Sequence, residues 1–349
     1  MASWTSPAAT ARALPWVLLL AALVASCAQP LTPPPQGIPS ADPNASPTPT
    51  PPPIASYAGV SDPQGLAFDA SGNLWLTNGA YGSTPAGRIL KLSNGTTVGM
   101  VDLGVELGAC VADSDSLWTV SASPSAKLWR IGLADLATES FPLATGSQPV
   151  SPQGLLVDPQ HRVWLADAAN QLVAIYRNGV WEQEFAIPKA TDSLGPTGLV
   201  RASESVWVAA QGDPRVYRRS VTDATDQGAV DLAKNATGVL GVDQNDLVWA
   251  GHAFYQGTQA VAKFAGPTSV PRYYDVAQDQ PVALVGDARG YMWAALRNRN
   301  LVARLTPADG TVVVYGSDAI VRPRAIAIDS QGNAWVASQE SVARIPAAP

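Results

Sequence analysis

The sequence has few of the side chains that most often carry out chemistry. Its 349 residues include two histidines, two cysteines and three methionines, and only 14% of them are charged. Two cysteines cannot build the disulfide framework of a small secreted domain. The sequence also lacks a nucleophile elbow, a phosphate-binding glycine loop and a CxxC pair. These absences exclude the enzyme classes that short motifs identify.

Positive charge is scarce as well. Five lysines and 17 arginines stand against 28 acidic residues, which gives a formal net charge of −6. No basic run interleaved with aromatics is present, so we expect no nucleic-acid partner. The densest basic stretch, residues 215–219, would alternate its charges between the two faces of a strand, and a solvated surface suits it.

Only one long apolar run occurs, and it lies near the start of the chain. Residues 14–23 (LPWVLLLAAL) follow Arg12 but are too few for the ~20 residues that a membrane-spanning helix needs. The run ends in VASC at residues 24–27, which resembles the lipobox of bacterial lipoproteins. This resemblance implies a signal peptide over residues 1–26 and acylation of Cys27. An ordinary cleaved signal and an uncleaved anchor remain open.

The lipobox resemblance also implies a location. The protein would be extracytoplasmic and attached to the cell-envelope membrane by a lipid at Cys27. Ala28 follows the cysteine, and in lipoproteins of two-membrane bacteria a residue other than Asp there goes with the outer membrane.

The segment from 27 to 53 has the composition of a tether. Eleven of the 26 residues from 28 to 53 are proline, and threonine, serine, alanine and glutamine fill most of the rest. Such a segment cannot bury a core and is expected to be disordered and extended, with a reach of about 80 Å at ~3.1 Å per residue. A passive linker and a proline-motif ligand are the two interpretations.

Tryptophan recurs at a regular period across residues 54–349. Intervals of 42 to 46 residues separate Trp75, Trp118, Trp164, Trp207, Trp249, Trp293 and Trp335. This period is typical of four-stranded propeller blades. Short apolar runs flank a turn in each unit, as at residues 70–73 (ASGN), and no helical periodicity appears. The sequence therefore predicts an all-β fold, a single seven-bladed β-propeller.

The seventh unit stops before a fourth strand, whereas residues 54–60 (IASYAGV) precede the first unit and have no other place. We expect residues 54–60 to pair with residues 342–345 and to close the ring. Each repeated Trp should pack against the next blade. The Asp six residues before most of them should accept backbone N–H groups in its turn.

The run PQGLAFDASGNLWLT at residues 63–77 resembles the repeat of NHL-type propellers, in particular the streptogramin (virginiamycin B) lyase group. The resemblance covers the whole repeat region and implies the propeller fold. It also implies catalytic histidines directly after the repeat proline and acidic residues that bind a divalent metal near the axis. The residues after that proline here are not histidine: they are Gln64, Gln153, Thr197, Val282 and Arg324.

The position three residues after each Trp, often Glu in that group, is acidic only at Asp167. A candidate ligand-binding site at one mouth of the ring would join Asn78, Asp167, His252 and Arg297. The alternative is that these residues are loop positions that face water. We expect no metal site, or, if there is one, Asp167 as a ligand.

Two other side chains could carry chemistry, but the sequence predicts no functional role for either. His161 falls in a turn and should be exposed, and Cys110 lies in an apolar run and should be a small buried hydrophobe rather than a nucleophile.

Two functions follow as hypotheses. The first is a noncatalytic lipoprotein, monomeric and without a cofactor, whose propeller binds or scaffolds a protein, glycan or small molecule. The second is a metal-dependent propeller lyase or lactonase, similar to the streptogramin lyases or the gluconolactonases, that uses Mg²⁺ or Ca²⁺.

Overall fold

The computed structural model describes the chain in nine stretches: residues 54–57, 62–79, 87–121, 126–143, 151–188, 193–232, 235–252, 260–276 and 279–347. All of them belong to one compact unit, Thr50–Pro349. The predictions for the signal peptide, Cys27 and the linker lie outside the described residues. Over the described stretches, no helix has the length and apolar character needed to cross a membrane.

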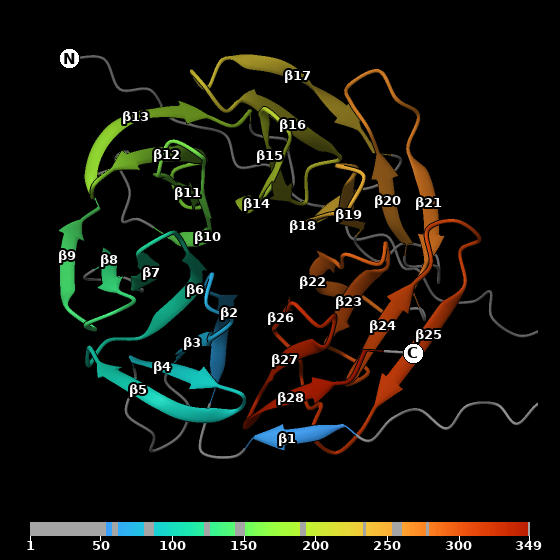
Figure 1. Cartoon of the computed structure of the whole chain (residues 1–349). Coiled ribbons are helices and arrows are strands. Elements are labelled where there is room, and N and C mark those ends of the chain that lie inside the picture. The colour runs from blue at the N-terminus through green and yellow to red at the C-terminus, as the bar shows by residue number, and fades with distance from the viewer. Residues whose placement is uncertain are drawn as a thin grey trace, which may run out of the picture. The chain divides into compact units, whose positions relative to one another are not determined.

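Seven four-stranded antiparallel sheets form the blades of a ring (Figure 1). Blade 1 consists of β2 (Pro63–Phe68), β3 (Leu74–Asn78), β4 (Arg88–Ser93) and β5 (Thr96–Asp102). Blade 2 consists of β6 (Leu107–Ala112), β7 (Ser116–Ser121), β8 (Lys127–Gly132) and β9 (Thr138–Pro142). Blade 3 consists of β10 (Pro152–Val157), β11 (Arg162–Asp167), β12 (Leu172–Arg177) and β13 (Val180–Ala186).

The remaining blades repeat this order. Blade 4 consists of β14 (Gly195–Ala202), β15 (Ser205–Gln211), β16 (Arg215–Ser220) and β17 (Asp226–Asp231), and blade 5 of β18 (Ala236–Val242), β19 (Val248–His252), β20 (Ala260–Phe264) and β21 (Arg272–Asp275). Blade 6 consists of β22 (Pro281–Gly286), β23 (Met292–Leu296), β24 (Leu301–Leu305) and β25 (Val312–Gly316). Blade 7 consists of β26 (Ala325–Ile328), β27 (Ala334–Ser338), β28 (Ser341–Ile345) and β1 (Ala55–Tyr57). The predicted seven-bladed propeller is confirmed.

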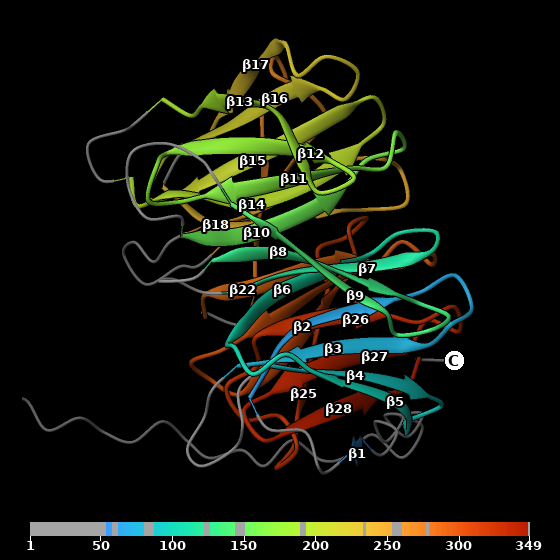
Figure 2. The same cartoon turned by 90° about the vertical axis from the view of Figure 1, so that its left-hand side faces the viewer.

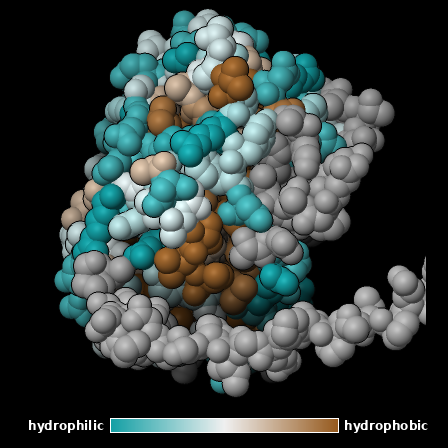
Figure 3. Space-filling model, turned by 90° about the vertical axis from the view of Figure 1, so that its right-hand side faces the viewer, coloured by the Kyte–Doolittle hydropathy of each residue, from teal (hydrophilic) through white to brown (hydrophobic). Residues whose placement is uncertain are grey.

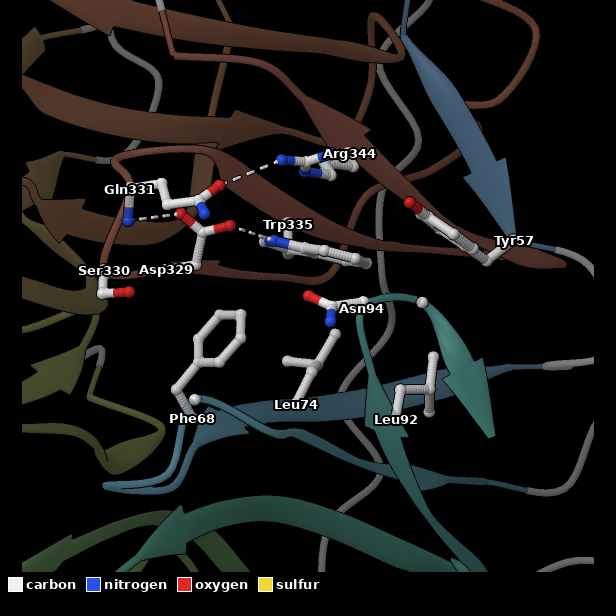
Figure 4. Close-up of a pocket in the computed structure, with 12 residues that line it drawn as sticks. Tyr57, Phe68, Leu74, Leu92, Asn94, Asp329, Ser330, Gln331, Trp335 and Arg344 are labelled. Atoms are coloured by element: carbon white, nitrogen blue, oxygen red, sulfur yellow. Dashed lines mark hydrogen bonds between the residues drawn. The ribbon is translucent and has the colours of Figure 1, made fainter. Parts of the chain in front are cut away.

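The first and last described strands meet in blade 7. Strand β1 runs antiparallel to β28, with Ala55 opposite Arg344 and Tyr57 opposite Val342. Tyr57 stacks on Trp335 with ring centroids 5.0 Å apart, and Figure 4 shows the two rings beside a seam pocket of about 110 Å³. Outer strands β9, β13, β21 and β25 supply Phe141, Phe185, Tyr274 and Tyr315 to the Trp of their own blades in the same way. The predicted closure by an N-terminal strand is confirmed, with Tyr57 as its aromatic anchor.

The core consists of the layers between neighbouring blades, seen edge-on in Figure 2. Every repeated Trp belongs to such a layer. For example, Trp164 of blade 3 packs with Val206 and Val208 of blade 4, and Trp335 of blade 7 packs with Leu74 and Leu92 of blade 1. Trp75, Trp164, Trp207, Trp249 and Trp293 are at most 2% exposed. The predicted packing of each Trp against the next blade is therefore confirmed.

The Asp before the Trp does more than hold its turn. In blade 1 the carboxylate of Asp69 accepts the backbone N–H groups of Ser71 and Asn73, as predicted, and also the indole N–H of Trp75 at 2.8 Å. Burial acts to raise the pKa of Asp69, but these hydrogen bonds outweigh burial and hold the pKa below its ordinary value. The same bond to the indole recurs in the Asp–Trp pairs of four more blades: 158–164, 243–249, 287–293 and 329–335.

A cation lies over the face of each repeated Trp ring. In six blades it comes from the residue directly opposite the Trp on the third strand: Lys91, Arg130, Arg218, Lys263, Arg304 and Arg344. Blade 3 has Ile175 at that place, and Arg162 stacks on Trp164 instead. Cation–π pairs of this kind stabilise by about 0.5–2 kcal/mol each, so the carboxylate, the indole and the cation act together in most blades.

The glycine of the P-x-G repeat lets neighbouring inner strands approach closely. A Cβ on Gly198 of β14 would lie 2.3 Å from the carbonyl oxygen of Gly238 on β18. The register of β14 against β15 shifts at the same place, between Pro196 and Gly198, which indicates a β-bulge. The repeat therefore brings the starts of the inner strands together around the axis.

The outer strands form the rim, and most of them carry charged residues. Strand β25 (VVVYG) carries none, and its Val313 and Val314 are exposed, as is Tyr273 of β21. Figure 3 shows apolar side chains on this side of the ring. Charged side chains usually keep an exposed edge strand from pairing with another chain, and β25 has none.

Candidate functional site

A cavity of about 470 Å³ opens at the end of the ring where the inner strands begin. Residues from β2, β6, β22 and β26 line it, together with the first residues of β10. Its four large polar lining side chains come from different blades: Gln64, Glu106, Gln153 and Arg324. Inner strands therefore bring to one place residues that are up to 260 positions apart in the sequence.

Three of these four polar residues occupy the same place in the repeat, directly after the proline. Gln64, Gln153 and Arg324 follow Pro63, Pro152 and Pro323, and Val282 after Pro281 also lines the cavity. Thr197, in the same place in blade 4, is absent from the lining and donates a hydrogen bond to the carbonyl of Gly238 at 3.0 Å. The position after the repeat proline is thus the one that faces the cavity.

Asp62 organises the junction of blades 7 and 1 beside the cavity. Its carboxylate is almost fully buried and lies 2.7 Å from Nη2 of Arg324. The side-chain amide of Gln64 donates to the other carboxylate oxygen at 2.8 Å. The backbone N–H of Asp62 donates to the carbonyl of Gln339 in blade 7. One carboxylate therefore positions two of the residues that line the cavity.

Arg297 follows β23 and lies near this junction. Burial lowers the pKa of its guanidinium, and repulsion from Arg324 and Arg322 lowers that pKa further, while Asp62 acts in the opposite direction. Within the described stretches the side chains of Arg297 and Arg322 form no hydrogen bond and no ion pair. Of these three arginines, Arg324 is the one that is paired with Asp62 within the described stretches.

Cys110 belongs to the cavity wall but has no sign of reactivity. The residue is part-buried on β6, next to Gly65 of β2. Burial raises the pKa of its thiol to about 12, against weaker opposing hydrogen bonds with Thr77. The thiol is therefore protonated at neutral pH and unsuited to nucleophilic attack.

Asn78 and Asp167 are buried, at 3% and 0% exposed. Asn78 accepts a hydrogen bond from the backbone N–H of Arg88, and Asp167 accepts from the N–H of Ser151 at 2.9 Å and from the amide of Asn170 at 2.7 Å. Both hold loops of their own blades. His252 ends β19, and its side chain lies outside the described residues. A joint site of these two residues with His252 and Arg297 stays a prediction.

His161 is exposed, as expected, and its Nδ1 lies 2.9 Å from the carboxylate of Asp113 in blade 2. Asp113 stands five residues before its Trp rather than six, and the indole N–H of Trp118 has no hydrogen-bond partner among the described residues. Within the described part of the chain, no group of three or more His, Cys, Asp or Glu side chains is placed to hold a metal ion.

Comparison with known proteins gives the fold a precedent. No protein-family model and no curated protein sequence matches the chain. Solved structures do. A streptogramin B lyase structure aligns with 15% identity and a TM-score of 0.71, over 83% of this chain and 96% of that one.

Two structures of virginiamycin B lyase from Staphylococcus aureus align over 85% of this chain and 99% of theirs, both at 14% identity. One is a catalytically inactive variant with quinupristin, with a TM-score of 0.73, and the other is the selenomethionine-substituted protein, with a TM-score of 0.71. The chain has the streptogramin B lyase fold. At this identity the likeness concerns the fold, and chemistry depends on the side chains.

Within the streptogramin B lyase fold, the cavity adds residues to those chosen from the sequence. Gln64, Gln153 and Arg324 were recognised only as replacements for histidine, and Asp62 and Glu106 were not recognised at all. Asp62, Gln64, Gln153 and Arg324 lie next to a repeat proline, which could have marked them, whereas Glu106 has no proline beside it.

Proposed function

We propose that the propeller is the noncatalytic ligand-binding head of a lipoprotein anchored to the cell envelope through Cys27. The observation that carries the proposal is the cavity at the start of the inner strands, whose lining includes two glutamines, one arginine and one glutamate. Sites for small molecules are concave and contain a few convergent polar groups. This cavity fits that description.

The chemistry of these side chains supports binding rather than catalysis. Glutamine amides do not titrate, and the arginine guanidinium stays protonated, so neither serves as a general base near neutral pH. Glu106 is exposed and is the one carboxylate among the lining residues. Amide and guanidinium groups do bind the hydroxyl, amide and acidic groups of a small molecule or glycan.

The anchored location rests on the sequence. A lipid at Cys27 and an extended linker to residue 53 would hold a monomeric head up to about 80 Å from the membrane. Ala28 is compatible with the outer membrane where the organism has one. Replacement of Cys27 by Ser should abolish labelling with a radioactive fatty acid and release the protein from membranes, and a labelled C27S variant would contradict the anchor.

Site-specific cross-linking in intact cells tests the binding function. A photoreactive residue replaces Gln153 at the cavity in the full chain, and in a matched control it replaces Gln160, which is exposed in the turn at the other end of β10. We expect an adduct from position 153 and none from position 160. No adduct from position 153, or equal adducts from both positions, would contradict a ligand site in the cavity.

A second function is a metal-dependent lyase or lactonase that uses Mg²⁺ or Ca²⁺. It is favoured by the alignment with streptogramin B lyases over 96–99% of their chains. A cation at 100 times its dissociation constant would stabilise the protein by about 2.7 kcal/mol. Thermal unfolding in EDTA and then with each cation tests this, with D167N as the variant that keeps the shape of the side chain. A shift present in the parent and lost in D167N would favour the enzyme.

A further inference from the structure

We propose that the seam pocket between blades 7 and 1 is a second binding site, which takes a primary amide group such as the end of a glutamine side chain. This is the pocket that Figure 4 shows beside Tyr57 and Trp335. It shares no lining residue with the cavity at the start of the inner strands. The proposal is therefore independent of the function proposed for that cavity.

The seam pocket lies where one turn glycine has no covering side chain. A Cβ on Gly290 of blade 6 would lie 2.5 Å from the amide nitrogen of Gln244 in blade 5. A Cβ on Gly332 of blade 7 would lie 3.4 Å from Nε of Arg289 in blade 6. A Cβ on Gly72 of blade 1, in contrast, would meet no atom of the described chain within 4 Å. The same place is thus filled by a planar polar group at two seams and open at this one.

The turn of blade 7 explains why the place is open. Gln244 directly follows the repeated Asp of its turn, and the corresponding residue in blade 7 is Ser330, whose side chain is shorter. The next residue, Gln331, turns toward its own blade, where its side-chain oxygen lies 3.3 Å from the amide nitrogen of Asn333 and 3.5 Å from Nη2 of Arg344. Neither side chain covers the turn glycine of blade 1.

The size of the seam pocket fits one chemical group rather than a whole molecule. Its volume is about 110 Å³, below the ~300 Å³ at which sites for drug-sized ligands begin. On one side of Trp335 lie the apolar side chains of the lining, which are Phe68, Leu74 and Leu92 (Figure 4). A short apolar stem with a small polar end suits these dimensions and this wall.

The charges of the lining select a neutral polar end. Asp329 and Arg344 are the two charged residues that line the pocket, so its lining has no net charge. Arg344 would repel a second guanidinium such as that of Arg289, and Asp329 would repel a carboxylate. A primary amide is uncharged and avoids both repulsions.

The hydrogen-bonding groups of the lining also match a primary amide. Within the described residues, the guanidinium of Arg344 makes one hydrogen bond, the 3.5 Å contact with Gln331. It therefore has donors left for the oxygen of an amide. The side chains of Asn94, Ser330 and Gln331, which also line the pocket, offer oxygen acceptors for the amide NH₂ group.

Substitution of Ser330 tests the chemistry of the pocket within the chain itself. S330Q gives blade 7 the residue that blade 5 has at Gln244, and it should raise the melting temperature of the full chain by about 1–3 °C. S330E has nearly the same shape but a charge, and S330L has a similar size but no polar end, so both should melt lower than S330Q. If S330Q melts no higher than S330E and S330L, the pocket does not favour an amide and the proposal is wrong.

An NMR titration of the full chain in detergent tests binding from outside. The indole N–H signal of Trp335, which lines the pocket, reports occupancy and is identified by its loss in W335F. The probes are propionamide, propionate and N-acetylglutamine methylamide: a free amide, the matching carboxylate and an amide on a peptide backbone. We expect at least one amide to bind with a Kd below about 10 mM, and propionate to bind at least about tenfold more weakly.

A variant pair links this binding to the seam pocket. S330Q should weaken the amide probe at least about tenfold because its own side chain occupies the pocket. S114Q is the matched control: Ser114 is exposed, directly follows an Asp in the turn of blade 2 and lies outside the pocket, so binding should not change.

The probes also identify the source of the amide. Binding of the glutamine derivative at least as tightly as propionamide indicates a side chain of a partner polypeptide, whereas tighter binding of propionamide indicates a small free amide. The proposal is overturned if neither amide binds at up to about 10 mM, if propionate binds as tightly as the amides, or if S330Q binds them as the parent does. None of these results depends on the cross-link from position 153, so the two sites stand or fall separately.

Discussion

Removal of the carboxylate of Asp243 should destabilise the propeller strongly. Asp243 accepts three N–H groups: the indole of Trp249 at 3.0 Å, and the backbone of Asn245 and Leu247 at 2.9 and 3.2 Å. Trp249 is fully buried, so its indole N–H would have no water to replace the lost acceptor. The ammonium of Lys263 lies 3.2 Å from the same carboxylate.

The magnitude follows from those groups. An unpaired buried donor costs about 1–3 kcal/mol, and the two turn N–H groups, which water reaches more easily, add less than about 1 kcal/mol each. D243A should therefore lower the free energy of unfolding by about 2–4 kcal/mol. Urea unfolding followed by tryptophan fluorescence measures it.

Blade 2 provides a matched control within the same chain. Asp113 stands one residue out of place, and within the described part of the chain the indole N–H of Trp118 has no hydrogen-bond partner. D113A removes an exposed contact with His161 and should cost less than about 1 kcal/mol. If D243A costs no more than D113A, the bond between carboxylate and indole does not stabilise the blades.

Three further predictions concern closure, pH and close packing. Deletion of residues 54–57 removes the outer strand of blade 7 and should lower the melting temperature, and Y57A alone, which loses the stack on Trp335, should cost about 1–2 kcal/mol; equal melting with and without residues 54–57 would refute the closure. The pKa values of Asp69, Asp243 and Asp329 are held below their ordinary value by hydrogen bonds that outweigh burial, so their contribution is present above about pH 4 and is lost as the pH falls through the lower folded-state pKa. Urea titrations between about pH 2 and 5 should show this decline, and D243N should show less of it; an equal decline would count against the assignment. G198A forces a Cβ to within 2.3 Å of the Gly238 carbonyl and should cost at least about 1–3 kcal/mol, whereas G72A, with no atom within 4 Å, meets only the strain of its φ of +80°; equal losses would argue against close approach of the inner strands.

The fold could be predicted from the sequence because all seven blades repeat the same pattern. Short apolar runs, a turn between them and one Trp recur seven times, so an ambiguous unit can be interpreted from the others. The closing strand was predictable because residues 54–60 had no other blade to join, and the structure pairs Ala55–Tyr57 of that segment with β28.

The bonds of the repeated Asp were only half predictable. The six-residue spacing was visible in the sequence, but backbone donors alone explained an Asp in a turn. Whether the carboxylate also reaches the indole depends on hairpin geometry, as Asp113 shows, where a spacing of five leaves Trp118 without a partner. The cation over each Trp could be identified only from the register of the second and third strands: Lys91 is opposite Trp75, and Arg344 is opposite Trp335.

The cavity could not be read from any single repeat. Gln64 and Arg324 are 260 residues apart in the sequence and come together because blades 1 and 7 are neighbours. Their common partner Asp62 precedes the first repeat proline, a place that carries no Asp in blades 3, 4, 6 and 7. The chemistry at a propeller axis depends on one residue from each of several blades. A periodic pattern shows what the blades have in common and does not show how these residues differ between blades.

The pairing of β1 with β28 also bears on where a propeller gene can begin. Ala55 is opposite Arg344, so the first residue of the closing strand lies beside the last residues of the chain. A circularly permuted gene in which residues 55–57 follow residue 347 through a short turn would encode blade 7 as four consecutive strands. It would place the new amino terminus at β2, next to Asp62 and the cavity. The natural order instead begins the described part of the propeller with β1, at the outer edge of blade 7.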